Sequence, residues 1–196
     1  MMKATEVLMT EHRVIEKVLS CLEAMATQAE EQGNLEMESA SQALDFFRGF
    51  ADHCHHGKEE GYLFPLLEAR GLPRVGGPIA VMLHEHEVGR QLLAEMAMAV
   101  DQQSPAAFVP PARSYIQLLR DHIWKEDQRL LRMADHLLNH KDDAQLMAAF
   151  EKTEQTDMEA GTHGRFHQLA NQLANRWGVS HETAGPRSCG GGCSHP

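Results

Sequence analysis

The sequence has no run of about 18 consecutive apolar residues, so no segment is expected to cross a membrane. Cysteine is scarce, with four residues in a chain of 196, and its placement does not suggest a secreted disulfide framework. The 18 basic residues are outnumbered by 28 acidic ones, and the formal net charge of −10 argues against nucleic acid or an anionic membrane as a partner. Residues 1–10 also lack an apolar stretch of signal-peptide length. Together these absences predict a cytoplasmic protein.

Tyrosine and tryptophan are rare, with two of each, whereas methionine occurs 11 times, and this composition suits helices better than sheets. Apolar residues recur at three- and four-residue steps in long segments that are separated by short breakers. We predict an all-α fold, an antiparallel up-down four-helix bundle with an additional C-terminal fifth helix. The four helices are expected at residues 3–32, 35–69, 78–103 and 104–139, and the fifth from Asp142 or Asp143 to Trp177. This domain covers residues 1–178, and residues 179–196 are predicted to be a flexible tail containing glycine and cysteine.

The 13 histidines are the main clue to function. Two segments share the pattern H-x-x-K-E, one from His55 to Glu59 and one from His122 to Glu126. Each is followed by a leucine at the same offset, Leu63 in the first copy and Leu130 in the second. A histidine and a glutamate four residues apart lie one turn apart on one face of a helix, so both can bind one metal ion or two neighbouring ions.

Positions along the chain predict that six such side chains lie at one height in the bundle. His12 is 21 residues before the break at Gly33 and His55 is 22 residues after it, so antiparallel helices bring them level. Solvated surface histidines would not be expected to align in this way. A core layer of imidazoles and carboxylates is costly unless a cation compensates, and these donors suit iron, manganese or zinc. The predicted layer consists of His12, His55, Glu59, His86, His122 and Glu126.

At this point the sequence resembles the hemerythrin-like family, the HHE cation-binding domains, over about residues 6–177. The resemblance is carried by an ordered pattern of H, HxxxE, H and HxxxE in residues 11–16, 55–65, 82–90 and 122–131. It implies an up-down four-helix bundle around a non-haem di-iron centre. By that resemblance Glu59 and Glu126 bridge the irons, and the terminal ligands are His12, His55, His86 and His122.

Three assignments stay open at this level. His56 and Glu60 also satisfy HxxxE, although His55 and Glu59 match the second copy of the repeat better, and His84 competes with His86. Oxygen-carrying hemerythrins have HxxxH on the third helix, whereas this sequence has Arg90, so one iron needs a further ligand or keeps an open position. On the fifth helix Glu159 and His163 repeat the carboxylate–histidine spacing, and we include His163 among the metal ligands.

The favoured hypothesis is a protein with two non-haem irons, oxo- or hydroxo-bridged, that reacts with or senses O2, peroxide or nitric oxide. The alternative is an iron-binding storage, delivery or sensing module without turnover, including the type that repairs iron–sulfur centres with an iron acceptor protein as its partner. In that case the tail pair Cys189 and Cys193 would matter, since it can form a disulfide or bind a metal. A purely structural bundle is a third hypothesis.

Overall fold

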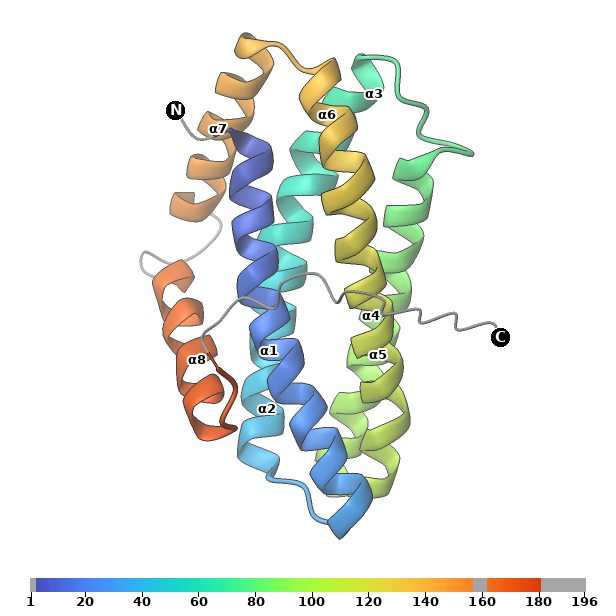
Figure 1. Ribbon diagram of the computed structural model, residues 1–196, viewed down its shortest axis with the longest axis vertical. Helices are drawn as coiled ribbons and strands as arrows, with labels where there is room; N and C mark the ends of the chain where they lie inside the picture. The colour runs from blue at the N-terminus through green and yellow to red at the C-terminus, as the bar shows by residue number, and fades with distance from the viewer. Residues whose placement is uncertain (1–2, 157–161, 181–196) are drawn as a thin grey trace, which may run out of the picture.

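The computed structural model describes residues 3–156 and 162–180, and within these ranges the chain is helical without any strand (Figure 1). No helix of the described part is long and apolar enough to cross a membrane. Three of the helical stretches, η1 to η3, are π-helices. In chain order the elements are α1 (Ala4–Gln32), α2 (Met37–Phe46), η1 (Phe47–His56), η2 (Glu59–Leu63), α3 (Phe64–Ala69), α4 (Pro78–Asp101), α5 (Pro105–Lys125), η3 (Glu126–Leu130), α6 (Leu131–Leu137), α7 (His140–Thr156) and α8 (Thr162–Arg176).

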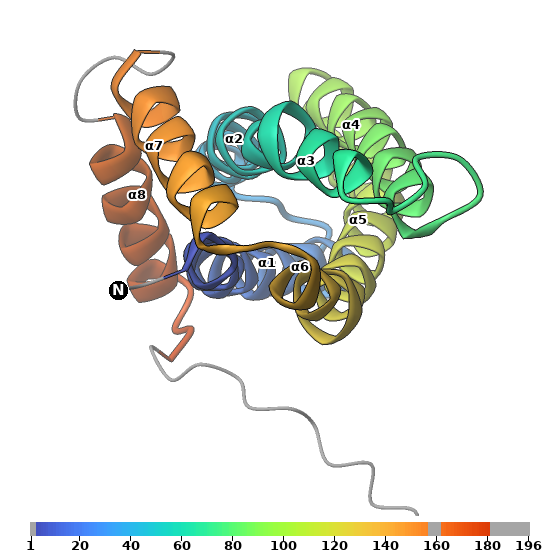
Figure 2. The same cartoon turned by 90° about the horizontal axis from the view of Figure 1, so that it is seen from above.

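These elements form four long arms, which are α1, the run from α2 to α3, α4, and the run from α5 to α6. Consecutive arms run in opposite directions along the long axis (Figure 1). Seen from above, the four arms surround a common interior (Figure 2). The arms correspond to the predicted helices at residues 3–32, 35–69, 78–103 and 104–139.

The arms end where the sequence supplies a terminating residue. Gly33 adopts a left-handed conformation with φ 62°, and its N–H donates to the carbonyl of Ala29, which closes α1. Ser104 caps α5 by accepting a hydrogen bond from the N–H of Ala107, and Pro105 occupies the first turn, where a missing N–H costs little. These boundaries fix the register in which neighbouring arms face each other.

The π-helical stretches depart from ordinary helical periodicity inside the second and fourth arms. A π-turn accommodates one more residue than an α-turn, so the side chains that follow it are rotated about the helix axis. η2 begins at Glu59 and η3 begins at Glu126, the final residues of the two H-x-x-K-E segments. The sequence repeat is thus also a repeat in backbone structure.

The predicted single fifth helix is wrong in one respect, because the structure has two separate helices there, α7 and α8. α7 packs against α1 and η2, whereas α8 packs against α1, α2 and η1. The ring of Phe166 lies directly over Gly49 of η1, since a Cβ at Gly49 would be 2.1 Å from Phe166 Cζ. Glu159 and the cysteines of the predicted tail lie outside the described residues.

Buried apolar side chains form two clusters at different heights along the arms. On α1 the larger cluster begins at Ile15, whereas the smaller one contains Ala4 and Leu8. Buried charged and imidazole side chains fill the interval between them. The apolar clusters therefore enclose a polar layer in the middle of the bundle.

Candidate metal centre

The structure brings six of the seven predicted site residues together in this polar layer. They come from all four arms, and each is at most 1% exposed. Such burial of ionisable groups requires compensation by partners or by a bound cation. The six residues are His12 of α1, His55 of η1, Glu59 of η2, His86 of α4, His122 of α5 and Glu126 of η3.

One group of potential ligands combines two imidazoles with two carboxylates. Nε2 of His12 lies 3.2 Å from Oε2 of Glu126, and Nε2 of His55 lies 3.5 Å from Oε1 of Glu59. One donor atom from each residue lies within 4.8 Å of the donor atoms of the other three. We call this set of His12, His55, Glu59 and Glu126 the two-imidazole group.

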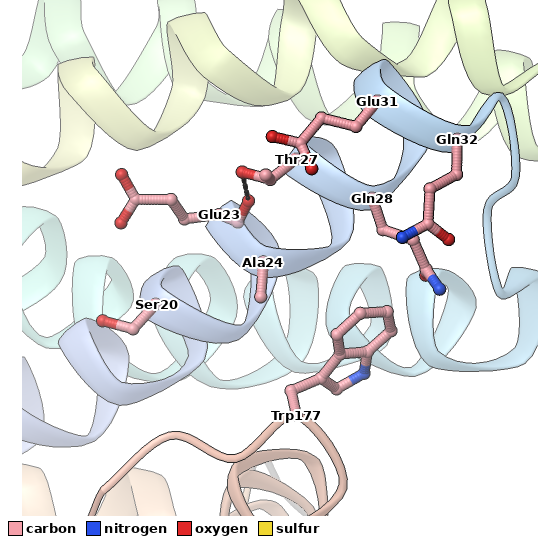
Figure 3. A pocket seen from close by; sticks show the side chains of 8 residues that line it. All are labelled: Ser20, Glu23, Ala24, Thr27, Gln28, Glu31, Gln32 and Trp177. Atoms are coloured by element: carbon pink, nitrogen blue, oxygen red, sulfur yellow. Dashed lines mark hydrogen bonds between the residues drawn. The ribbon is translucent and has the colours of Figure 1, made fainter.

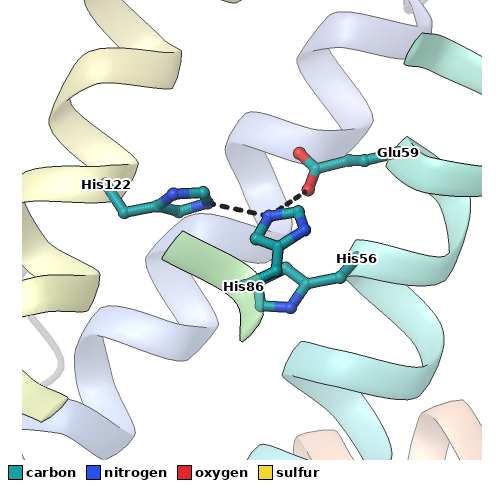
Figure 4. A group of neighbouring side chains, drawn as sticks. All are labelled: His56, Glu59, His86 and His122. Carbon is teal, nitrogen blue, oxygen red and sulfur yellow. Dashed lines mark hydrogen bonds and ion pairs between the residues drawn. The ribbon is translucent and has the colours of Figure 1, made fainter. Parts of the chain in front are cut away.

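A second group combines three imidazoles with the same Glu59 (Figure 4). Nε2 of His86 lies 3.5 Å from Oε2 of Glu59 and 3.2 Å from Nε2 of His122. The ring of His56 stacks on that of His86, with ring centroids 3.7 Å apart. We call His56, Glu59, His86 and His122 the three-imidazole group; its donor atoms also lie within 4.8 Å of one another.

The two carboxylates of the layer connect the groups. Glu59 belongs to both of them. Oε2 of Glu126 lies 3.2 Å from Nε2 of His12 in one group and 3.4 Å from Nε2 of His122 in the other. Carboxylates that reach two sites from separate helices are suited to holding two metal ions a few Å apart.

His56 is the potential ligand that sequence reasoning missed, because it was weighed as an alternative to His55 and not as an addition. In a regular α-helix two adjacent side chains point about 100° apart, whereas both residues lie at the end of the π-helix η1 and both face the layer. The signal was the histidine doublet together with the missing third-helix histidine at Arg90. His84, the competitor of His86, is exposed.

The donor atoms of the layer fit a bound cation. Among the described residues, Nε2 of His12 and of His55 and all four carboxylate oxygens of Glu59 and Glu126 have no hydrogen-bond partner. Buried polar atoms are rarely left without a partner, since each costs about 1–3 kcal/mol. Imidazole nitrogen and carboxylate oxygen together are donors that iron, manganese and zinc accept, so the residues fit the implied metal.

In each of the five imidazoles of the layer, Nδ1, the ring nitrogen on the side away from the other ligand atoms, contacts a carboxylate. The separations range from 2.7 Å at His12 to 3.3 Å at His56. A carboxylate at Nδ1 fixes the tautomer that carries its proton there and leaves Nε2 free to bind a metal. The pairs are His12 with Asp127, His55 with Glu11, His56 with Asp52, His86 with Glu60, and His122 with Glu85. We call these five acidic residues the outer carboxylates.

A basic side chain contacts every outer carboxylate. The lysines of the two H-x-x-K-E segments take part, because Lys58 bonds to Glu11 and Lys125 bonds to Glu85. The lysine that the two copies of the repeat share therefore has a structural role. The full set of contacts is Arg13 with Asp127, Lys58 with Glu11, Lys125 with Glu85, and Arg90 with both Asp52 and Glu60.

Protonation of the layer reflects its burial and its charges. Burial and the neighbouring Glu126 raise the pKa of Glu59 well above its usual value. Burial acts on Glu126 in the same sense, but the surrounding histidines outweigh it and hold the pKa of Glu126 well below the usual range. Burial lowers the pKa of His55 to about 4, whereas at His12 the neighbouring carboxylates of Asp127 and Glu126 outweigh burial and raise the pKa to about 9. A cation entering the layer would have to displace a proton from His12, and its charge would favour the ionised form of Glu59 that burial disfavours.

The structure places His163, the seventh predicted residue, outside both groups. Its Nε2 lies 3.6 Å from Oε1 of Glu11 and its side chain is 30% exposed. It lines a pocket of about 270 Å³ between α1, α7 and α8, so it borders the outer carboxylate of His55 instead of the layer. His163, Glu11 and Cys54 form a further cluster of donors, but Lys58 bonds to Glu11 there, and burial raises the pKa of the Cys54 thiol to about 12.

A separate hollow lies at the other end of α1, against Trp177 (Figure 3). Its volume is about 490 Å³. None of its lining residues belongs to either imidazole group, so it has no part in the candidate centre. The lining consists of Ser20, Glu23, Ala24, Thr27, Gln28, Glu31, Gln32 and Trp177.

Comparison with known proteins agrees with this geometry. The model of the hemerythrin HHE cation binding domain matches residues 3–134, the part of the chain that carries both imidazole groups. This chain is 27% identical over 132 residues to uncharacterized proteins of Mycobacterium tuberculosis and Mycobacterium bovis. The match covers 63% of this chain and 50% of each relative. The chain thus spans about half the length of the curated relatives it matches. No solved structure matches the chain significantly.

Proposed function

The chain belongs to the hemerythrin HHE cation-binding family, and from this we propose that it holds two non-haem iron ions and binds or reacts with O2, peroxide or nitric oxide. The observation that carries the proposal is the convergence of seven buried side chains with potential ligand atoms. Nε2 of His12 and of His55 and the four carboxylate oxygens of Glu59 and Glu126 lack hydrogen-bond partners among the described residues, and Nδ1 of each imidazole is anchored by an outer carboxylate. We also propose that the four arms form the up-down antiparallel four-helix bundle of the family and that α7 and α8 are additional helices packed against this bundle.

In this proposal the donors divide between two irons. Glu59 and Glu126 would serve both ions, since each carboxylate lies beside imidazoles of both groups. The three-imidazole group would hold one ion and the two-imidazole group would hold the other. The second ion has one imidazole fewer, which favours its side of the centre as the place where a small ligand binds. Bound iron would supply affinity for diatomic ligands and one-electron redox chemistry.

The chain itself supplies orientation, charge and exclusion of water. The outer carboxylates orient the imidazoles and make them more basic donors. The ionised Glu59 and Glu126 would balance the charge of the metal ions. The two apolar clusters enclose the layer at both heights and keep bulk water away from it. Loading of the centre would be accompanied by deprotonation of His12, whose pKa is raised to about 9, and the bound cation would offset the burial and the neighbouring Glu126 that raise the pKa of Glu59.

Burial also bears on the choice between a resident centre and iron as a cargo. Every proposed ligand is at most 5% exposed, and release of a metal ion would require the arms to separate. This favours a resident centre over a module that stores or delivers iron. It also favours a small ligand, since nothing larger fits a layer enclosed in this way.

The test is to load the protein with two equivalents of Fe(II) without oxygen and to expose it to O2, hydrogen peroxide and nitric oxide in turn. We expect two irons per chain and an absorption change with at least one of the three. Glu59→Gln should lose iron, whereas His84→Ala, which alters an exposed histidine beside the site, should keep it. Failure to bind iron would contradict the proposal. Two bound irons that respond to none of the three molecules and that mild chelators remove would support the storage or delivery alternative.

A further inference from the structure

Arg90 stands one turn beyond His86 on α4, and its forked guanidinium contacts two carboxylates of the second arm. Its Nε donates to Oδ1 of Asp52 at 2.9 Å, and its Nη2 donates to Oε1 of Glu60 at 2.6 Å. The Arg90 side chain is 36% exposed, and Asp52 and Glu60 are 26% and 30% exposed. A planar guanidinium with fixed donors can hold two acceptors in one geometry, which an ammonium group cannot do.

The same two oxygen atoms also face the imidazoles of the three-imidazole group. Oδ1 of Asp52 lies 3.3 Å from Nδ1 of His56, and Oε1 of Glu60 lies 2.8 Å from Nδ1 of His86. Each oxygen therefore lies between the guanidinium of Arg90 and one imidazole. A displacement of Arg90 would act on both rings at once.

The two imidazoles are in turn packed against each other. The rings of His56 and His86 are stacked, with an angle of 13° between their planes. The bonds to His86 and Arg90 lower the pKa of Glu60, and the bonds of Asp52 to His56 and Arg90 outweigh its burial and lower its pKa to about 2. Both carboxylates are thus ionised at neutral pH and accept the Nδ1 protons, which leaves both Nε2 atoms available to one ion.

The other half of the centre has no equivalent of this shared contact among the described residues. Arg13 contacts Asp127, which serves His12, and Lys58 contacts Glu11, which serves His55. Each of these cations acts on a single imidazole. Arg90 differs because it acts on two imidazoles that belong to the same group.

We infer that Arg90 is a positioning residue for one of the two metal ions: through Asp52 and Glu60 it fixes His56 and His86, and it leaves the two-imidazole group unaffected. The inference rests on the proposed metal centre. It explains how the chain accommodates arginine on the third helix, since His56 supplies an imidazole from the second arm and Arg90 holds it in place. Arg90 touches none of the donor atoms itself and acts only through the outer carboxylates.

The consequence is an asymmetric response of the two ions to substitution. Loss of an outer partner of a metal-binding histidine weakens metal affinity by about 10- to 100-fold. Arg90→Met should weaken one of two binding steps by this factor and leave the other at the wild-type value. Arg90→Lys should restore only part of the loss, because one ammonium cannot reproduce both contacts. In an Asp52→Asn background, Arg90→Met should cause a smaller further loss of metal affinity, because Arg90 acts on His56 through Asp52.

The experiment is a titration of the metal-free protein with Co²⁺, followed by visible absorption and calorimetry. The matched control is Glu87→Gln, because Glu87 also lies near Arg90, with 3.9 Å between Oε2 and Nη1, but is 60% exposed and contacts no imidazole. Arg13→Met probes the opposite half, and combining it with Arg90→Met should weaken both steps. Thermal unfolding of each metal-free variant separates loss of metal affinity from loss of the fold.

The outcomes are distinguishable. If the wild-type protein binds no Co²⁺, the proposed metal centre fails. If it binds two ions and Arg90→Met binds both with unchanged affinity, the centre stands and the role of Arg90 is refuted. An equal loss in both steps from Arg90→Met alone would also refute it, since the effect would then be a general one on the bundle. A loss confined to one step, with partial recovery in Arg90→Lys, is the expected result.

Discussion

Replacing His56 by glutamine is expected to remove one of two metal ions and to leave the other in place. His56 is stacked on His86 and its ligand atom lies with those of Glu59, His86 and His122, so its loss deprives the three-imidazole group of one donor. His56 does not belong to the two-imidazole group. Within that group, His55 is the residue whose ring contacts the ring of His56. Glutamine keeps most of the volume of the side chain and limits collapse of the layer around it.

The size of the effect follows from the number of donors. A structural zinc site of four ligands contributes about 10–16 kcal/mol of apparent binding free energy, which is about 2.5–4 kcal/mol for each donor. Loss of one donor from the group of four should therefore raise the dissociation constant of that ion by roughly 10²- to 10³-fold. The other ion should change by less than about tenfold, because it loses no ligand.

The assay is the same titration of metal-free protein with Co²⁺ or Zn²⁺, with metal content measured after gel filtration. His53→Gln is the matched control, since His53 lies in the same π-helix but is exposed. The expected result is about one ion retained in His56→Gln and two in both His53→Gln and the wild-type protein. Retention of two ions with unchanged affinity in His56→Gln would refute the assignment of both members of the histidine doublet to the centre.

Three further outcomes are expected. Lys58→Met should lower the free energy of unfolding by about 3–5 kcal/mol, because it removes the lysine cation that is paired with the buried Glu11. Lys141→Met, at an exposed position, should change the free energy of unfolding by less than about 0.5 kcal/mol, and equal effects of the two substitutions in denaturant titrations would contradict this. The pKa of His12 is raised to about 9, so its contribution to the stability of the metal-free protein is complete below about pH 6.5 and is lost as the pH rises through 9. The apparent metal affinity should rise between about pH 6.5 and 9, because the metal ion displaces a proton from His12 on binding. Calorimetry in buffers of different ionisation enthalpy measures this proton, and metal binding without proton release would contradict the prediction. Phe166→Ala should lower the free energy of unfolding by about 3–5 kcal/mol without changing the metal content, and a loss of metal would show that α8 supports the centre.

Much of the fold was predictable because it depends on local signals. Gly33 and Ser104 end or begin arms as the breakers indicated, and apolar periodicity located the long helices. Six residues of the layer were also predictable, since antiparallel arms of similar length bring positions equally far from a turn to the same height. The helical rise and the positions of the breaks are sufficient to place these six residues at one height.

The remaining features depend on departures from regular geometry or on contacts between arms. Periodicity arguments assume 3.6 residues per turn, and the π-helices in the second arm violate that assumption where His55 and His56 both enter the layer. The partner of His55 is Glu11, from another arm, so no sequence spacing could identify it. α7 ends at Thr156 and α8 begins at Thr162, and in the sequence between them Gly161 is the one helix-breaking residue type, a weaker signal than the breakers that separate the four arms.

The most direct test of the account is an X-ray diffraction experiment on iron-loaded crystals, with anomalous data collected on both sides of the iron absorption edge. We expect two iron peaks a few Å apart in the polar layer. One should lie among His56, His86 and His122 and the other beside His12 and His55, with Glu59 and Glu126 between them. A single peak, or iron bound only outside this layer, would contradict the proposal of a di-iron centre.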